Sequence, residues 1–260
     1  MTLTPTTFEP RSITLADDEL AGRVIAITGA TGGYGRALAL ECARRGAEVI
    51  LIGRNVKKLE ALHEEITRTA RLNGGATAEP SIAPLDLEKA IASDYDALAD
   101  AVGARWGRLD GLVHNAAILG QIAPIEQQDV PTWVRVMHVN VTAPFALTQV
   151  LLPQLQNSAD ASVVCISSGV GRHARAYWGA YAVSKYALEG LAAVLADELE
   201  NTRTRVNTLN PGRLRTAMRR AAYPSEDPQT LPTPESATTA CVALLGPASR
   251  GVTGGRFDAQ

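Results

Sequence analysis

The sequence predicts an α/β protein with one doubly wound domain, in which a parallel sheet of roughly seven strands lies between layers of helices. Two observations predict this fold. Short apolar runs alternate along the chain with longer segments of helical periodicity, and the first apolar run leads directly into a glycine-rich turn at residues 28–35. Because short parallel strands must be joined by crossovers above or below the sheet, this alternation favours helices on both faces.

The predicted strands are runs of aliphatic and β-branched residues of strand length, bounded by turn residues. In chain order they cover residues 24–28, 49–52, 81–85, 109–114, 162–167, 205–209 and 251–257. The predicted helices carry apolar residues three and four positions apart, which is the spacing of one helix face. They cover residues 35–46, 56–71, 97–106, 131–155 and 181–201, and the first of them begins near Gly33.

Two segments fall outside this alternation. Residues 1–21 are polar, contain Pro5 and Pro10 and show no sustained apolar period, which predicts an arm lying on the body or on a partner subunit. Residues 211–234 carry five prolines, which predicts a long excursion of the kind that forms a lid or binding loop. We therefore expect one domain over residues 22–260, with a substrate loop at about 212–236.

Composition excludes several classes of protein. The 260 residues carry 25 Lys and Arg against 27 Asp and Glu, so a net charge of −2 provides no cationic field to attract nucleic acid or anionic lipid. The longest uninterrupted apolar runs are far shorter than the roughly 20 residues of a membrane span. The N-terminus lacks the basic start and apolar core of a secretory signal. We therefore expect a cytoplasmic protein that binds neither nucleic acid nor membrane.

Cysteines and histidines give no sign of a disulfide framework or a metal site. Cys42, Cys165 and Cys241 are far apart and form no C-x-x-C pair, which predicts buried structural thiols. The four histidines lack the spacing of metal ligands, so no catalytic metal is expected. His114 ends a buried strand and is expected to be structural.

The glycine-rich turn is the first candidate binding site. Gly29, Gly33 and Gly35 follow the first strand with the spacing Gly-x-x-x-Gly-x-Gly, and a helix begins within the turn. Glycines let backbone amides approach a pyrophosphate closely, and the helix N-terminus adds oriented N–H groups. The spacing differs from the commoner G-x-G-x-x-G fingerprint of dinucleotide-binding domains. In this context the turn predicts a nucleotide cofactor held by its phosphates.

The spacing of this turn and five later motifs resemble the short-chain dehydrogenase/reductase family. The motifs occur in the family's order over residues 22–258, and their joint match is far more specific than any one alone. The resemblance implies a Rossmann-like fold, a nicotinamide cofactor and carbonyl or alcohol chemistry. The motifs are His114-Asn115-Ala116-Ala117 after the fourth strand, Asn140 in the following helix, Ser168 after the fifth strand, Tyr181-Ala182-Val183-Ser184-Lys185, and Asn210-Pro211-Gly212.

Tyr181 and Lys185 are four residues apart, so they share one face of the predicted helix. A nearby ammonium favours the phenolate and is expected to lower the tyrosine pKa toward working pH, as a general acid/base requires. By resemblance, Ser168 positions the carbonyl oxygen, Tyr181 gives or takes its proton, and Lys185 also holds the nicotinamide ribose. The resemblance further implies that Asn140 anchors a water linking Lys185 to solvent. These four are the candidate catalytic residues.

Cofactor choice is expected to depend on the end of the second strand. An NAD enzyme carries an acidic residue there to bind the ribose 2′-OH, whereas this chain has Gly53 followed by Arg54. A guanidinium can pair with a 2′-phosphate, so NADP(H) is favoured over NAD(H). The full set of candidate cofactor-binding residues is Gly29, Thr31, Gly33, Tyr34, Gly35, Arg54, Asp86, Leu87, Asn115, Ala116, Ala117, Tyr181, Lys185, Pro211, Gly212, Leu214 and Thr216.

Three departures from the family pattern bear on this site. Ala117 replaces a glycine that usually lies near the cofactor, and Tyr34 replaces a small aliphatic residue, so both are expected to narrow the cofactor cleft. The ending Phe257-Asp258-Ala259-Gln260 lacks the frequent Gly-Gly, which puts the usual subunit contacts there in question. This ending, with the segments at 170–172 and 178–181, also resembles one bacterial subgroup of oxidoreductases within the family.

Basic residues are concentrated in the loops expected to surround the substrate. This concentration predicts an anionic substrate or the phosphates of an acyl carrier, with solvated loop arginines or cofactor-phosphate contacts as the alternative reading. Aromatic and apolar residues are expected to form a wall of the same pocket. The candidate substrate residues are Arg172, His173, Arg175, Tyr177, Trp178, Met218 and Arg219.

The sequence as a whole predicts an NADP(H)-dependent oxidoreductase that moves a hydride between nicotinamide and a small-molecule carbonyl or alcohol. A non-catalytic NADP(H)-binding sensor or scaffold protein remains the alternative, because a preserved site does not prove turnover. Non-redox sugar-nucleotide chemistry is disfavoured by the single-domain length. The long helices at 131–155 and 181–201 resemble those that pair subunits in the family, so a homodimer or homotetramer is expected.

Overall fold

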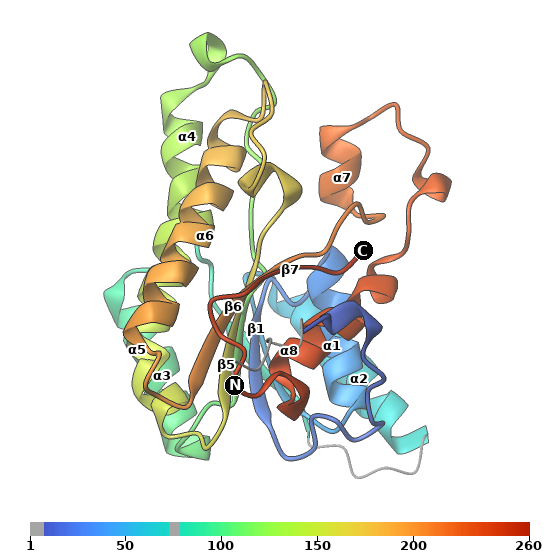
Figure 1. Ribbon diagram of the computed structural model, residues 1–260, viewed down its shortest axis with the longest axis vertical. Helices are drawn as coiled ribbons and strands as arrows, with labels where there is room; N and C mark the ends of the chain where they lie inside the picture. The colour runs from blue at the N-terminus through green and yellow to red at the C-terminus, as the bar shows by residue number, and fades with distance from the viewer. Residues whose placement is uncertain (1–7, 73–78) are drawn as a thin grey trace, which may run out of the picture.

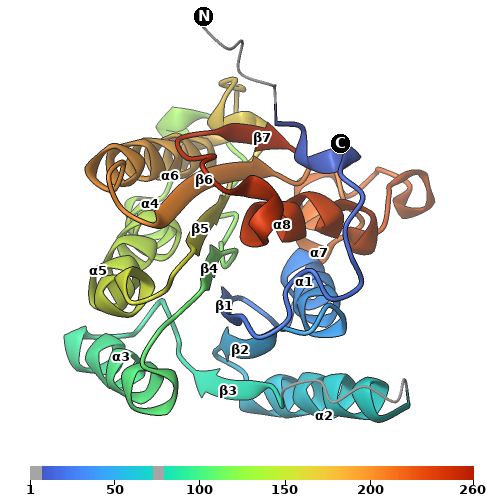
Figure 2. The ribbon, with the colours of Figure 1, turned by 60° about the horizontal axis from the view of Figure 1, so that its bottom comes forward.

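The computed structural model describes residues 8–72 and 79–260, so residues 1–7 of the predicted arm lie outside the described residues. Seven parallel strands form one sheet in the order β3-β2-β1-β4-β5-β6-β7 (Figures 1 and 2). The predicted doubly wound fold is confirmed. The strands are β1 (Val24–Thr28), β2 (Glu48–Gly53), β3 (Ser81–Pro84), β4 (Gly111–His114), β5 (Ala161–Ile166), β6 (Thr204–Asn210) and β7 (Arg256–Asp258).

Helices cover both faces of the sheet, and each face encloses its own apolar core. In Figure 2, α1, α2 and α8 lie on one side of the strands, while α3, α5 and α6 lie on the other. The central strands β1, β4 and β5 are buried along their whole length, as expected for strands covered on both faces. The helices are α1 (Gly33–Arg44), α2 (Val56–Leu72), α3 (Ala92–Trp106), α4 (Val130–Met137), α5 (Ala143–Gln156), α6 (Gly179–Glu198), α7 (Ala217–Ala222) and α8 (Thr238–Leu245).

Two helices were not predicted, and the last strand is shorter than predicted. Almost every residue of α8 is buried, so the helix has no polar face and shows no amphipathic period in the sequence. The short helix α7 lies within the proline-rich excursion. The predicted strand at 251–257 is reduced to Arg256–Asp258 because Gly251 and Gly254 adopt positive φ angles of 78° and 70°, which interrupt an extended backbone.

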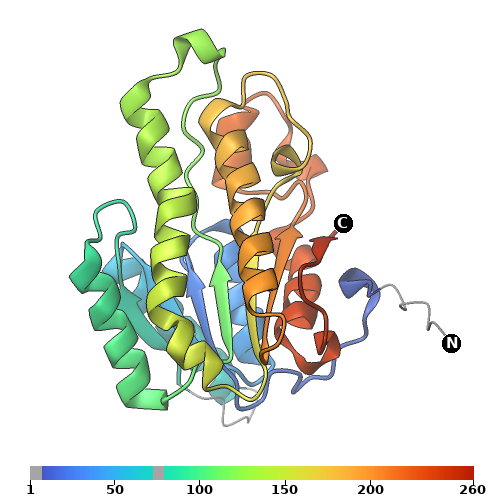
Figure 3. The same cartoon turned by 60° about the vertical axis from the view of Figure 1, so that its left-hand side comes forward.

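The helix predicted at 131–155 is divided by a π-helical turn at His138–Thr142 between α4 and α5. By length and composition the run Val130–Gln156, with a mean hydropathy of 1.2, is apolar enough to cross a membrane. Polar residues interrupt this run, so it is not one of the uninterrupted apolar runs of the sequence. In this fold 44% of that apolar window is buried inside the protein. The run lies over the sheet beside α6 (Figure 3).

The described part of the predicted arm lies on the body. Leu20 is fully buried, and Phe8 and Leu15 pack against the core beneath α8. The Phe8 ring meets the Phe257 ring edge-on, with 5.5 Å between the ring centroids. The arm therefore adds apolar contacts to β7, the outermost strand of the sheet.

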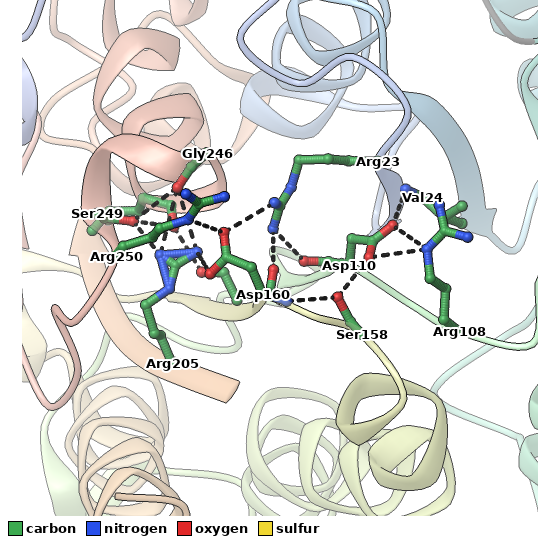
Figure 4. A network of polar contacts seen from close by, with 12 residues as sticks. Arg23, Val24, Arg108, Asp110, Ser158, Asp160, Arg205, Gly246, Ser249 and Arg250 are labelled. Carbon is green, nitrogen blue, oxygen red and sulfur yellow. Dashed lines mark hydrogen bonds and ion pairs between the residues drawn. The ribbon is translucent and has the colours of Figure 1, made fainter. Parts of the chain in front are cut away.

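A network of charged groups joins the amino-terminal ends of three strands (Figure 4). Asp160, directly before β5, lies 3.2 Å from the guanidinium groups of Arg23, before β1, and Arg205, in β6. Arg250 approaches the same carboxylate at 3.4 Å. Burial lowers the pKa of Arg205 to about 10, and the Asp160 charge opposes that shift. Asp160 is therefore the shared anion that keeps two largely buried arginines paired.

Candidate active site

The candidate site is a cavity of about 460 Å³ at the carboxyl ends of the strands, where open α/β sheets bind ligands. It is lined by Ser168, Tyr181 and Lys185, but not by Asn140. All of the predicted cofactor-binding residues line it except Gly35. Three of the seven predicted substrate residues also line it, namely Trp178, Met218 and Arg219.

The glycine-rich turn between β1 and α1 is built for close backbone approach. Gly29 and Gly33 adopt φ angles of 65° and 48°, a region that favours glycine. A Cβ on Gly35 would lie only 2.4 Å from Asn115 Nδ2 and 2.4 Å from the Gly29 carbonyl oxygen. Gly35 therefore does not line the cavity, but its missing side chain lets the turn pack against the loop after β4.

The sequence predicts that Tyr34 narrows the cofactor cleft, but in the structure its phenol points away from the cleft. The Tyr34 hydroxyl donates a hydrogen bond to the Ala237 carbonyl at 3.0 Å, inside the core between α1 and α8. Burial raises the pKa of Tyr34 well above its usual value. The Tyr34 ring packs in the core beneath α8. The local sequence does not show that this space exists.

The loop after β4 is held by Thr28. Its hydroxyl accepts hydrogen bonds from the backbone N–H groups of Asn115 and Ala116, each at 3.0 Å. The Asn115 side chain donates to the Thr28 carbonyl at 2.9 Å. His114 is buried beneath this loop and bonds Thr148 at 2.7 Å, and desolvation lowers its pKa to about 3, so it is neutral. These contacts support the expectation that His114 is structural.

Tyr181 and Lys185 project from the first turns of α6 toward the end of β5. The Lys185 ammonium donates to the Ile166 carbonyl at 2.7 Å and lies 5.7 Å from the centroid of the Tyr181 ring. Both side chains are buried, at 2% exposure for Lys185 and 7% for Tyr181. Ser168 follows β5 and is close enough to Tyr181 for a hydrogen bond between their hydroxyls. Two hydroxyls and one ammonium thus meet at the cavity wall.

The expected fall in the pKa of Tyr181 is wrong for this structure. Burial raises the pKa of Tyr181 to about 12, and the hydrogen bond with Ser168 only partly opposes this rise. The ammonium of Lys185 turns to the Ile166 carbonyl and faces the ring rather than the phenol oxygen, so its effect is small. Desolvation instead lowers the pKa of Lys185 to about 8. At neutral pH the phenol is therefore protonated.

Asn140 does not line the cavity but hydrogen-bonds to segments that do. It lies in the π-helical turn, where an extra residue per turn redirects side chains and often marks a functional position. Its amide accepts from the Ile118 N–H at 2.8 Å, donates to the Ile118 carbonyl at 3.0 Å, and donates to the Ser184 hydroxyl at 3.0 Å. Asn140 thus joins the loop after β4 to α6, the helix that carries Tyr181.

Arg172 was predicted to contact substrate, and the structure corrects this. Its guanidinium pairs with Glu189 at 3.0 Å and with Asp258 at 3.1 Å, and only 12% of its side chain is exposed. Glu189 lies one turn beyond Lys185 and also accepts from Thr208 at 2.8 Å and pairs with Arg256 at 2.9 Å. This cluster ties the loop of Ser168 to α6, β6 and β7.

Three other predicted substrate residues lie outside the cavity lining. His173 and Arg175 are exposed, and Arg175 donates to the Tyr223 hydroxyl at 2.7 Å. Tyr177 is 60% exposed and is the one non-glycine residue with positive φ, at 74°, in the described part of the chain. Their loop turns outward before α6 begins, so only Trp178 faces inward.

The opposite end of the cavity is where the sequence places the adenosine half of the cofactor. Arg54, Asp86 and Leu87 line it, and Arg54 is 66% exposed, lying 3.7 Å from Glu88. The glycine turn, the exposed cation and the cavity between them fit a phosphorylated dinucleotide. Among the described residues, no group of three or more His, Cys, Asp or Glu side chains could hold a metal ion.

Several residues that shape the site were missed from the sequence. Leu119 and Glu88 line the cavity, while Tyr223 and Glu226 hold Arg219, a cavity-lining residue, in place. Glu189 pairs with Arg172 and acts on Lys185 through its charge. No local motif marks these residues. Only the acidic character of Glu226, seven residues after Arg219, was visible beforehand.

Comparisons with known proteins agree with this geometry. A family model described as short chain dehydrogenase matches residues 23–227. The oxidoreductase YciK of Escherichia coli K12 is 46% identical over 243 residues, which cover 94% of each chain. A short chain dehydrogenase structure from Salmonella enterica serovar Typhi CT18 is 47% identical with a TM-score of 0.92, covering 95% of this chain and 100% of that one. Another, from Escherichia coli CFT073 in complex with NADPH, is 47% identical with a TM-score of 0.89, covering 94% and 99%.

Proposed function

Because the chain belongs to the short-chain dehydrogenase family and is an oxidoreductase of that family, we propose that it uses NADP(H) to interconvert a small-molecule carbonyl and its alcohol. The observation that carries this proposal is the meeting of Ser168, Tyr181 and Lys185 at one wall of a cavity that begins at the glycine-rich turn. We further propose that residues 22–260 act as one nucleotide-binding unit, with residues 212–236 as its substrate loop.

The side chains support a division of labour. When bound, the nicotinamide supplies or accepts the hydride. The phenol of Tyr181, with a pKa of about 12, holds a proton at neutral pH and gives it to the carbonyl oxygen during reduction. The Ser168 hydroxyl lies beside the phenol and orients the same oxygen. The Lys185 ammonium would hold the nicotinamide ribose, and its position under the ring gives the phenolate that remains only weak support.

Relatives support the cofactor. The Escherichia coli CFT073 structure is a complex with NADPH, and a 46% identical structure from Shigella flexneri is a complex with NADP. In this chain, Arg54 would hold the 2′-phosphate and the turn at Gly29 and Gly33 would hold the pyrophosphate. No carboxylate occupies the position of Gly53 to favour the unphosphorylated ribose.

Replacing Arg54 by Ala should weaken NADPH binding by about tenfold or more, the value of one charge-assisted hydrogen bond, and leave NADH binding unchanged. Titration of each nucleotide by nicotinamide fluorescence measures this. Arg135→Ala is the matched control, because Arg135 also faces Glu88, at 3.8 Å, but does not line the cavity.

Equal losses for both nucleotides would contradict the assignment of Arg54. If neither nucleotide binds the wild-type protein, the oxidoreductase mechanism fails. If NADPH binds tightly but no carbonyl compound is reduced, the sensor or scaffold alternative is favoured.

Glu189 should tune the reaction through Lys185. Its negative charge raises the pKa of Lys185, which burial holds at about 8. In Glu189→Gln the ammonium should therefore lose its proton at lower pH, and the falling limb of the pH profile of carbonyl reduction should shift to lower pH. Glu198→Gln, an exposed change on the same helix, should leave the profile in place. An unshifted profile in Glu189→Gln would contradict this coupling.

We also propose a homodimer or homotetramer. Large apolar side chains are exposed along α4, α5 and α6. In Figure 3, α4 and α5 follow one another as one long helix, and α6 runs beside it. Burying these side chains between subunits would remove that area from water. The cytoplasmic location stays a prediction. The exposed side chains are Val130, Val134, Phe145, Val183, Tyr186 and Val194.

A further inference from the structure

The cavity wall beyond the reacting hydroxyls is apolar. Trp178 and Met218 line it and pack with Leu119 against a small buried cluster that includes Tyr181 and Val170. These residues come from the loops after β4, β5 and β6. The wall that faces the Tyr181 hydroxyl is thus assembled from hydrocarbon and aromatic surface.

An aromatic row continues this wall toward α7. The ring centroid of Trp178 lies 5.7 Å from that of Tyr181 and 5.9 Å from that of Tyr223. The Tyr223 hydroxyl accepts a hydrogen bond from Arg175 at 2.7 Å. Because Tyr223 ends α7 and Arg175 precedes α6, this contact joins two elements whose helices stand apart in Figure 1.

Arg219 lines the cavity together with this apolar wall, and its charge is already neutralised. Its guanidinium makes two parallel hydrogen bonds to the Glu226 carboxylate, each at 2.6 Å. It also stacks over the Tyr223 ring at 3.8 Å from the centroid. Only 17% of the Arg219 side chain is exposed. An anionic ligand would have to compete with a bidentate carboxylate for this group.

Two other arginines of these loops also lie near acidic residues. Arg172 is paired with Glu189 and Asp258, away from the cavity. Arg213 lines the cavity at its exposed edge, and its charge acts on the same Glu226 carboxylate, lowering the pKa of that group. Arg172 and Arg219 are therefore paired with acidic residues, whereas Arg175 is exposed and donates its hydrogen bond to the Tyr223 hydroxyl.

Resting on the proposed oxidoreductase function, we propose that the substrate is a neutral carbonyl compound with an aromatic or similarly flat apolar group, seated against Trp178, Met218 and Leu119. Glu226 is the specificity-determining residue, because it occupies the Arg219 guanidinium and makes that group unavailable to an anionic substrate. In reduction, the hydride of NADPH goes to the carbonyl carbon and the proton of Tyr181 to its oxygen, leaving the alcohol and NADP⁺. This proposal replaces the expectation, based on the loop arginines alone, that the substrate is anionic.

A pair of aldehydes of similar shape tests this proposal. 4-Isopropylbenzaldehyde and 4-carboxybenzaldehyde differ in whether the ring carries a branched alkyl group or a carboxylate. Binding is measured by calorimetry with and without NADP⁺, and turnover by NADPH absorbance. The wild-type protein should bind the isopropyl compound at least about tenfold more tightly than the carboxylate compound, because the carboxylate would enter the pocket without a partner for its charge.

Two variants separate the roles of charge and aromatic surface. Glu226→Gln frees the Arg219 guanidinium and should raise affinity for 4-carboxybenzaldehyde about tenfold while leaving the isopropyl compound unchanged. Trp178→Ala should weaken binding of the isopropyl compound about tenfold, because its ring loses a stacking partner. Glu235→Gln, an exposed change in the same excursion, is the matched control and should alter neither.

The outcomes distinguish this proposal from the function on which it rests. Equal or reversed affinities for the two aldehydes, or no gain for the carboxylate in Glu226→Gln, would overturn the substrate class while NADPH binding left the cofactor assignment intact. Absence of NADPH binding would defeat the oxidoreductase mechanism, and the aldehyde preference measured without nucleotide would still support or overturn the apolar pocket.

Discussion

Replacing Tyr181 by Phe should lower kcat for NADPH-dependent carbonyl reduction by about 10²- to 10⁴-fold, which is the usual contribution of a positioned general acid. The phenyl ring still packs against Trp178, whose centroid lies 5.7 Å away, so the pocket keeps its shape. Only the proton held at the phenol oxygen is lost. The affinity for NADPH should change by less than about threefold, because a group that acts in the transition state contributes little to cofactor binding.

Single-turnover kinetics with excess enzyme, alongside fluorescence titration of NADPH, measure both quantities. Tyr186→Phe provides a matched control, since Tyr186 is on the same helix, is 42% exposed and does not line the cavity. It should retain wild-type rates. A Tyr181→Phe variant that still reduced carbonyls at the wild-type rate would show that another group donates the proton.

Replacing Asp160 by Asn should destabilise the fold by about 3 kcal/mol, the lower end of the cost of breaking a buried ion pair. The substitution keeps the size of the side chain but removes the charge shared by Arg23 and Arg205. Arg205 is the more costly of the two, because only 6% of its side chain is exposed and burial already lowers its pKa. The network lies at the amino-terminal ends of the strands (Figure 4), whereas the cavity lies at their carboxyl ends, so NADPH affinity of the folded protein should be unchanged.

Urea unfolding followed by circular dichroism gives the change in the free energy of unfolding. Asp17→Asn is the matched control, because Asp17 pairs with Arg44 at 3.2 Å but is 95% exposed, and such pairs contribute about 0–1 kcal/mol. Equal midpoints for Asp160→Asn and the wild-type protein would mean that the hydrogen bonds that Arg205 donates to the Ser249 hydroxyl and the Gly246 carbonyl suffice to hold it.

Local sequence determined much of the fold. β1 has the predicted bounds of 24–28, and α2, α3 and α6 begin or end within a few residues of their predicted positions. These elements carry their own signals in apolar period and turn residues. α8 was missed because a helix buried on all sides has no period to read, and the turn at His138–Thr142 was missed because it depends on packing against the sheet and α6.

For the site, the sequence alone determined much of the cavity lining: Gly29, Gly33, Arg54, Ser168, Tyr181 and Lys185 all line it, whereas Gly35, Asn140 and four of the predicted substrate residues do not. Motifs reveal such residues because most of them directly follow a strand, and the carboxyl ends of the strands form the edge where the cavity lies. Only the tertiary structure decided their electrostatic state. The pKa of Tyr181 rises with burial, and Arg172 and Arg219 are neutralised by Glu189 and Glu226. Burial and ion pairing depend on which segments meet in space, and spacing along the chain does not determine that.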